Sequence, residues 1–347
     1  MTIQNLIESG NYIDEFKKHK VIYRKYPKQG LLIAKRKYGC SYSSSEDWLN
    51  YCRGLVIDYI NHKIVFLPPV KSSEILTRDE FLDTVENSYE LVDGTMVNMF
   101  YYNDEWNVST RSNIGCTNQW SKDINFKEMF DECKQFNTDD LDRECSYSFV
   151  MRHKKNRIIS KISENKLYLV EIRKNNQLIK LNPGCSLPEG CSLPEGCSLP
   201  EKSSEISGLK KGLTGYNGVI RYKWITNEHK FLDMIKPNTN NPCLNYLILR
   251  NSGYLTQYLK MFPEYRFEFN TYRTRLHDIT KQLYEYYKHV FISKDLEKSD
   301  IPFVFRPLLY DIHGIYLQKK QGITWTDIKQ YIHELEPKRL QFVINNL

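Results

Sequence analysis

The sequence lacks any run of about 18 or more apolar residues, the length that a helix needs to cross a bilayer. It also lacks a positively charged start followed by an apolar segment, which is the pattern of a secretory leader. These two absences argue against a membrane-embedded or secreted protein. We therefore expect no membrane partner and predict an intracellular, cytoplasmic protein.

Paired cysteines of the kind that bind metal or form disulfides are missing as well. The nine cysteines include no Cys-x-x-Cys pair, and no Cys/His spacing is typical of a zinc site. An odd number of cysteines in a chain of 347 residues does not suggest the disulfide framework of a small secreted domain. We expect reduced thiols and no structural metal.

Positively charged residues only slightly outnumber negatively charged ones. Lys and Arg number 49 against 42 Asp and Glu, which gives a net charge of +7. Such an excess favours a polyanionic partner only where the positive charges cluster, because many soluble proteins reach it without binding nucleic acid. The 25 tyrosines and 16 phenylalanines are enough to build a core and to offer surfaces on which bases can stack.

Periodicity divides the chain into two predicted domains. Up to residue 235, apolar and polar residues alternate as in half-buried strands, and from residue 236 the period is near 3.6, as in helices. We predict a sheet domain over 1–235 and a helical C-terminal domain over 236–347, an α+β fold. Residues 184–201 are three copies of Gly-Cys-Ser-Leu-Pro-Glu, which we expect to form an exposed loop insertion in the first domain.

Three segments between residues 51 and 120 carry the most informative pattern. They are YCRGLVID (51–58), YELVDGTMVNMFYY (89–102) and WNVSTRSNIG (106–115). Each alternates between turn signals, so we predict that they are consecutive strands of one sheet. The same reasoning predicts other strands at 21–26, 31–38 and 63–66, and helices at 2–16, 77–86, 126–133, 244–251, 254–261, 272–291, 308–318 and 324–335.

The order of these segments is an Arg-Gly strand, an x-x-Asp-Gly strand and a basic Ser/Thr-rich strand. This order resembles the nucleotide-binding domain of phage-type RNA ligases, which belong to the covalent nucleotidyltransferase superfamily with DNA ligases and mRNA capping enzymes. The resemblance implies a ligase-type antiparallel-sheet domain with a nucleotide pocket, followed by a helical C-terminal domain. It is closest in kind to the motif-depleted homologues of large DNA viruses, including giant viruses.

In that family the second strand opens with Lys-x-Asp-Gly, and the lysine amine attacks the α-phosphate of ATP. Leu91 stands in its place here, and its side chain has no lone pair with which to form a phosphoramidate. Val150 and Asn217 take the places of two glutamates that contact the ribose or a metal ion. The resemblance therefore implies a pseudoenzyme with no catalytic residue. It is compatible with a bound purine nucleotide, while the lost carboxylates argue against Mg²⁺.

Other positions keep residues that suit a nucleotide or RNA. By resemblance the candidate binding residues are Arg53, Asp93, Gly94, Trp106, Arg111, Arg152, Lys154, Lys155, Arg157 and Lys223. Plainer interpretations stay open: a structural ion pair for Arg53, an ordinary turn for Asp93-Gly94 and a solvated hairpin tip for 152–157. For the basic run 35–37 we favour a solvated strand edge over a phosphate contact.

Three functional hypotheses follow. The first is a degenerate ligase-like protein that binds RNA, without DNA specificity, at its 5′ end or at an mRNA cap, where Trp106, Tyr101 and Trp120 are candidates for stacking a methylated guanine. The second is an active RNA ligase or adenylyltransferase that uses an unaligned lysine. The third is a scaffold subunit of a viral RNA-processing or translation complex, which docks a protein partner through its helical C-terminal domain.

Overall fold

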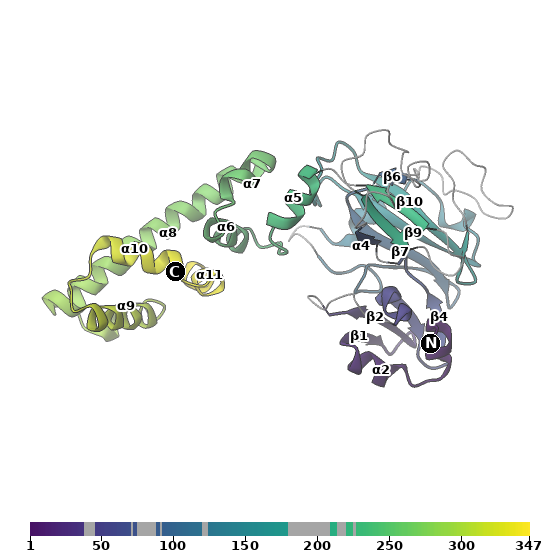
Figure 1. Cartoon of the computed structure of the whole chain (residues 1–347), viewed down its shortest axis with the longest axis horizontal. Helices are drawn as coiled ribbons and strands as arrows, with labels where there is room; N and C mark the ends of the chain where they lie inside the picture. Colours follow the sequence, from purple (N-terminus) through teal and green to yellow (C-terminus); the bar gives the residue numbers. More distant parts are fainter. Residues whose placement is uncertain are drawn as a thin grey trace. The chain divides into compact units, whose positions relative to one another are not determined.

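The computed structural model describes most of the chain in two compact units, Met1–Lys230 and Phe231–Leu347 (Figure 1). The division falls inside helix α5 (Asn227–Ile235), whereas the sequence places the domain boundary after residue 235. Side chains are described for residues 1–37, 46–70, 92–119, 124–179 and 230–347, and the backbone alone for 72–74, 88–90, 209–213, 220–224 and 227–229. Leu91, Trp120, Asn217, the repeats at 184–201 and the predicted helix at 77–86 lie outside the described residues.

The first unit begins with a four-stranded antiparallel sheet. In spatial order its strands are β1 (Val21–Tyr26), β2 (Leu31–Arg36), β3 (Arg53–Asp58) and β4 (Lys63–Phe66). Helices α1 (Ile3–Glu8) and α2 (Tyr12–Lys18) pack on one face, in a core that includes Phe16 and Trp48. The single helix predicted over 2–16 is wrong, because the chain turns between α1 and α2 at Gly10, which adopts a φ of 73°.

A second antiparallel sheet of five strands follows. In spatial order its strands are β11 (Gln177–Ile179), β10 (Lys166–Lys174), β9 (Cys145–Arg152), β7 (Thr95–Tyr102) and β8 (Glu105–Ser109). Helix α4 (Phe126–Cys133) packs against β9 and β10 (Figure 1). It begins with a capping box made by Asn125 and Glu128, and it confirms the helix predicted over 126–133.

The face of the second sheet away from α4 meets the first sheet in a smaller core. Ile33 and Val56 of the first sheet pack with Phe100 of β7. The ring centroids of Phe66 and Phe100 lie 5.6 Å apart. Because strand residues alternate between faces, Asn98, two residues before Phe100, also points toward the first sheet.

The prediction that segments 51–58, 89–102 and 106–115 share one sheet is wrong. β3 belongs to the first sheet and β7 and β8 to the second, since alternation indicates which face is buried and not which strand is the neighbour. Segment 89–102 also divides at the Asp93-Gly94 turn, and its first part pairs elsewhere. It joins a third sheet, in the order β5 (Ser72–Glu74), β12 (Leu209–Leu213), β13 (Ile220–Trp224) and β6 (Ser88–Glu90).

The second unit is helical, and with the sheets of the first unit it confirms the predicted α+β fold. Its helices are α6 (Pro242–Asn251), α7 (Leu255–Met261), α8 (Arg266–Tyr287), α9 (Arg306–Lys319), α10 (Trp325–Glu334) and α11 (Pro337–Asn345). α8 continues into a π-helical turn at Lys288–Ser293. Short 3₁₀ turns lie at Asp47–Tyr51, Thr138–Asp140, Pro263–Tyr265 and Lys298–Asp300. Within the described ranges, no helix is long and apolar enough to span a bilayer.

Candidate functional site

Two basic segments that are distant in the sequence meet at Gly54. This glycine adopts a φ of 111°, and a Cβ on it would lie 3.1 Å from the Cα of Arg111 and 3.3 Å from the carbonyl oxygen of Thr110. The start of β3 therefore touches the backbone that follows β8, and only a glycine allows so close an approach in this conformation. This contact places Arg53 beside Arg111.

Lys35 is the third cation at this position. It faces Arg53 in the β2–β3 register and is half-buried. Burial, and then the nearby charge of Arg111, lowers the pKa of Lys35. Among the described side chains, no carboxylate pairs with Lys35 or Arg111. We call Lys35, Arg53 and Arg111 the cation cluster, because a local excess of positive charge favours an anionic ligand.

The interpretation of residues 35–37 as a solvated strand edge is wrong for its first two members. β2 is an inner strand of the first sheet, so its residues face neighbours on both sides. Lys35 is half-buried and Arg36 is buried, whereas Lys37 is exposed. Lys35 belongs to the cation cluster, and of the three residues only Lys37 is solvated.

A row of buried polar side chains crosses the second sheet on the face toward the first. Its members are paired in register from β8 to β10: Ser109, Asn98, Ser148 and Glu171. Both polar atoms of the Asn98 amide and the Ser109 hydroxyl are buried and have no hydrogen-bond partner in the described part of the chain. The same holds for Nε of Arg111. Each such atom costs about 1–3 kcal/mol unless a polar group satisfies it, so these atoms point to a polar ligand.

The Asp93-Gly94 turn is held by the loop that follows β9. Oδ2 of Asp93 accepts hydrogen bonds from the backbone N–H groups of Ile159 and Ser160, both at 2.7 Å. Nδ2 of Asn156 donates to Oγ1 of Thr95 at 2.7 Å. A Cβ on Gly94 would lie 2.4 Å from the carbonyl oxygen of Met151 in β9. Asp93 therefore holds the loop that follows β9 in place. A glycine is needed at position 94 because the backbone of β9 packs too closely for a side chain.

Comparisons with known proteins bear on the family. No family model matches the chain. It is 21% identical over 247 residues to a protein of Autographa californica nuclear polyhedrosis virus that is described as a bifunctional polynucleotide kinase/RNA ligase. The alignment covers 62% of this chain and 35% of the viral protein, so the chain spans about a third of that relative's length. This weak sequence similarity is consistent with a ligase-like protein of the nucleotidyltransferase superfamily.

A solved structure is also similar to the chain, at a low level. It is a protein named as an ATP-dependent DNA ligase of Aquifex aeolicus, which is 18% identical, with a TM-score of 0.43. The superposition covers 81% of this chain and 77% of that one.

The basic turn at 152–157 is partly used to hold the chain's own backbone. Nη2 of Arg152 donates to the carbonyl oxygen of Lys161 at 2.8 Å, and Nε of Arg157 donates to that of Ile159 at 3.1 Å. Lys154 and Lys155 are exposed to solvent. The two lysines are thus the available cations of this turn.

His153, between them, is structural. Its side chain is 1% exposed, its Nε2 lies 2.8 Å from Oε2 of Glu132, and its Nδ1 accepts from the backbone N–H of Lys155 at 3.2 Å. The hydrogen bond from His153 lowers the pKa of the Glu132 carboxyl. Both ring nitrogens are therefore occupied, and neither is available to a phosphate.

The two aromatic candidates that lie in the described part of the chain, Trp106 and Tyr101, do not join the cation cluster. Trp106 and Tyr101 are cross-strand partners 5.4 Å apart between ring centroids, and Trp106 packs on Tyr147 in the core beneath α4. Strand alternation places Trp106 on the opposite face from Ser109. Lys223 lies on β13, where only its backbone is described.

Sequence reasoning missed the polar row and undervalued Lys35. Asn98 is the residue that indicates the polar row in the sequence, because its amide interrupts the apolar run of 96–102. The described side chains contain no group of three or more His, Cys, Asp or Glu residues that suits a metal ion. The candidate site is built from cations, an amide, hydroxyls and the carboxylate of Glu171, which pairs with Arg173.

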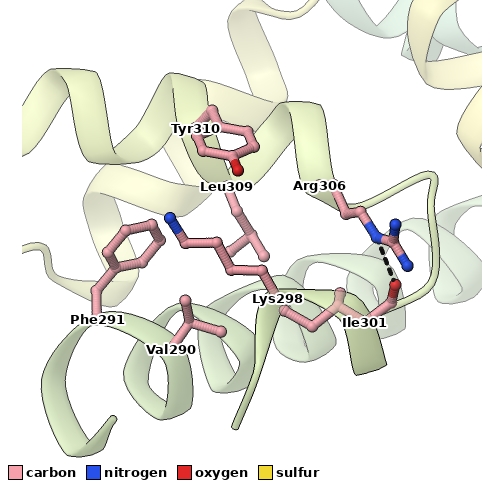
Figure 2. Close-up of a pocket in the computed structure, with 7 residues that line it drawn as sticks. All are labelled: Val290, Phe291, Lys298, Ile301, Arg306, Leu309 and Tyr310. Atoms are coloured by element: carbon pink, nitrogen blue, oxygen red, sulfur yellow. Dashed lines mark hydrogen bonds between the residues drawn. The ribbon is translucent and has the colours of Figure 1, made fainter.

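A small cavity in the helical unit is already filled by the chain itself. The ammonium of Lys298 lies 5.1 Å from the ring centroid of Phe291 and 4.8 Å from that of Tyr310 (Figure 2). Arg306 closes one end by donating from Nε to the carbonyl oxygen of Ile301 at 2.9 Å. The remaining volume is about 10 Å³, which holds no more than a water molecule.

Proposed function

We propose that this ligase-like protein binds the phosphorylated 5′ end of RNA at the cation cluster and forms no covalent lysyl-nucleotide. The observation that carries the proposal is the meeting of Lys35, Arg53 and Arg111 beside buried polar atoms that lack partners. RNA is proposed because the viral sequence relative is described as a polynucleotide kinase/RNA ligase.

The chemistry of the cluster suits a terminal phosphate. An arginine offers a planar fork of N–H donors that matches phosphate oxygens, and the charge-assisted bonds are stronger than neutral ones. The half-buried position of Lys35 weakens solvent screening, which strengthens its attraction to an anion. The amide of Asn98 and the hydroxyl of Ser109 then supply a donor and acceptors for the adjoining ribose or base.

Two substitutions support binding without catalysis. Leu91 stands where the resembled ligases have their nucleophilic lysine, and Val150 stands where they have a glutamate. Glu171 lies in the polar row, but its Oε1 is 2.6 Å from Nε of Arg173 in an ion pair whose two side chains are 2–3% exposed. We therefore propose no Mg²⁺ cofactor for this site.

The aromatic residues favour a phosphate over an mRNA cap as the end group. Cap recognition by stacking needs an aromatic face beside the phosphates. Trp106 and Tyr101 pack on each other instead, and Trp106 lies on the face toward α4. A capped RNA is accordingly proposed to bind no more tightly than one with a 5′-monophosphate.

A second candidate function is supported by Lys35. A lysine that is half-buried beside another cation loses its proton more readily and becomes a better nucleophile. Lys35 would then be the unaligned lysine of an active adenylyltransferase, in which its Nζ attacks the α-phosphorus of ATP and pyrophosphate leaves.

Two assays test these proposals together. Incubation with ATP labelled at the α-phosphate, with Mg²⁺ or Mn²⁺, followed by denaturing electrophoresis should give no labelled protein. A label that maps to Lys35 would contradict the first function and establish the second. In parallel, one fluorescent RNA with a 5′-hydroxyl, 5′-monophosphate, 5′-triphosphate or cap should bind about tenfold or more tightly with a 5′-phosphate than with the hydroxyl. Equal affinity for all four ends would refute the proposed end recognition.

A further inference from the structure

A polar pocket lies in the first unit, away from the cation cluster. It has a volume of about 190 Å³, and its lining includes Phe100, Tyr101, Arg143, Ser146, Arg173 and Asn176. The register pairs Asn98 with Ser109 and Tyr101 with Trp106, so Arg111 lies beyond one end of these strands and the pocket at the other. At about 3.3 Å per residue, the two sites are roughly 15 Å apart along the sheet.

Arg173 forms a fixed donor at the floor of this pocket. Its side chain is 2% exposed; Nε lies 2.6 Å from Oε1 of Glu171, and Nη1 donates to the carbonyl oxygen of Asn176 at 3.1 Å. Nη2 is buried and has no hydrogen-bond partner in the described ranges. Two bonds thus fix the guanidinium, and its third nitrogen lacks an acceptor that a ligand can supply.

The wall beside Arg173 is preformed. Asn175 and Asn176 adopt φ values of 51° and 63° in the tight turn between β10 and β11, a conformation that asparagine tolerates better than most residues. Nδ2 of Asn176 donates to the carbonyl oxygen of Ile64 at 3.2 Å, which ties the turn to β4. The backbone N–H of Asn175 donates to the carbonyl oxygen of Glu144 at 3.3 Å. Binding here requires little ordering of the wall.

Arg143 and Tyr101 form the rim. The guanidinium carbon of Arg143 lies 5.0 Å from the Tyr101 ring centroid, and Arg143 is exposed. No ion pair of Arg143 occurs among the described side chains. A planar guanidinium held over an aromatic ring offers its outer face to another planar group.

Charges around the pocket balance, which argues against a phosphate. The three carboxylates and three cations at or beside it are Asp142, Glu144, Glu171, Arg143, Arg173 and Lys174. Lys174 pairs with Asp142 at 3.2 Å and Glu144 at 3.0 Å. A neutral ligand with an acceptor on its edge suits this balance. The volume is below the roughly 300–1,000 Å³ of sites for drug-sized ligands, so the pocket suits a ligand the size of one ring system. The planar guanidinium of Arg143 favours a ligand that is also planar.

We propose that this pocket takes one unpaired nucleobase of the RNA strand whose 5′ end lies at the cation cluster. The base stacks on Arg143, and its carbonyl oxygen or ring nitrogen accepts from Nη2 of Arg173. The proposal rests on the proposed function for its RNA strand, and it adds a base contact a few nucleotides from the phosphate.

The test uses the full chain and a 5′-phosphorylated RNA in which 2-aminopurine, or an abasic site, occupies each of the first eight positions in turn. One position should show quenched fluorescence and a loss of about five- to tenfold in affinity when abasic. Arg143→Ala should abolish both effects, and Arg143→Lys, which keeps the charge without the plane, should abolish the quenching. Arg24→Ala is the matched control, because Arg24 is also exposed and lies 5.2 Å over the ring of Tyr26.

The outcomes separate this pocket from the proposed function. If the phosphate preference is present but no position responds to Arg143→Ala, the base pocket is refuted and the proposed function stands. If the positional effect depends on Arg143 while 5′-hydroxyl and 5′-phosphate RNA bind equally, the pocket stands and the proposed function fails. Free guanosine or adenosine that binds without any positional effect in RNA would also refute the base contact.

Discussion

A Cβ on Gly54 would lie 3.1 Å from the Cα of Arg111, so the first and second sheets approach backbone to backbone at this point. The two residues come from β3 and from the loop after β8, which the sequence does not pair. Their contact assembles the cation cluster, because Arg53 precedes the glycine and Lys35 faces Arg53 across the β2–β3 ladder. The cluster therefore depends on the absence of a side chain at position 54.

Gly54→Ala should weaken both stability and RNA binding. Alanine is strained at a φ of 111° and its methyl group would meet backbone atoms, so we expect a loss of about 1–3 kcal/mol in the free energy of unfolding by urea. The matched control is Gly314→Ala in α9, where nothing lies within 4 Å of the added Cβ and a gain of about 0.5–1 kcal/mol is expected. Equal stability of Gly54→Ala and the wild type would contradict the close approach.

Asp93→Ala should destabilise the first unit more than an ordinary surface substitution. It removes the acceptor of two backbone N–H groups, those of Ile159 and Ser160, which should cost about 2–3 kcal/mol in urea unfolding. Asp139→Ala, at an exposed residue, should stay within about 0.5 kcal/mol of the wild type. If Asp93→Ala instead left stability unchanged and reduced RNA affinity, Asp93 would be a ligand contact and not a brace.

Lys35→Met should weaken RNA binding and leave the free energy of unfolding unchanged or higher. Removal of a half-buried cation beside Arg111 relieves burial and repulsion, so the variant should unfold at equal or higher urea concentration. The same change should weaken binding of 5′-phosphorylated RNA about tenfold and reduce the slope of log affinity against log salt by about one. Lys37→Met, two residues away and exposed, is the control and should change neither property strongly. A fall in stability without a loss of affinity would contradict the phosphate role.

Asp58 and Tyr102 should make the first unit sensitive to pH at both extremes. Burial raises the pKa of Asp58, but hydrogen bonds from Asn61, Tyr102 and Ile60 outweigh it and lower the pKa overall. That stability is present above the ordinary Asp value of about 4 and is lost as the pH falls below it. Burial and the bond to Asp58 raise the pKa of Tyr102 to about 12, so its contribution is present below about pH 10 and is lost as the pH rises toward 12.

The variant Tyr102→Phe isolates this pair. It removes a 3.0 Å hydrogen bond to Oδ2 of Asp58 and should cost about 1 kcal/mol at neutral pH. Its free energy of unfolding should also fall less than that of the wild type between pH 10 and 12, measured by urea titration at each pH. Parallel curves for the two proteins over that range would show that Tyr102 does not titrate as described.

Local signals in the sequence located many elements but not their neighbours. The strands predicted at 21–26 and 63–66 match β1 and β4, and the capping residues Asn125 and Glu128 mark the start of α4. Alternation could not assign β3 and β7 to different sheets, because it carries no information on strand partners. The helix predicted at 77–86 and the repeats at 184–201 lie outside the described residues and stay predictions.

The motifs predict Arg53 and Arg111 as binding residues. The structure places Gly54, which follows Arg53, against the backbone of Arg111, and the binding role of both arginines stays a prediction. Asp93 and the arginines at 152 and 157 bond to the chain's own backbone, which only the folded loop reveals. Trp106 is predicted to stack a base, yet strand alternation places it, partly buried, against the core beneath α4. A protein partner for the helical unit stays a prediction.

The measurement that tests the central claim most directly is a thermodynamic cycle on the 5′ phosphate. Affinities of one RNA with a 5′-monophosphate or a 5′-hydroxyl are compared for the wild type and for Arg111→Gln. The account predicts that the wild type prefers the phosphate about tenfold or more and that Arg111→Gln reduces the preference to near one, with little change for the hydroxyl RNA. The same phosphate preference in both proteins, or none in the wild type, would contradict phosphate binding at the cation cluster.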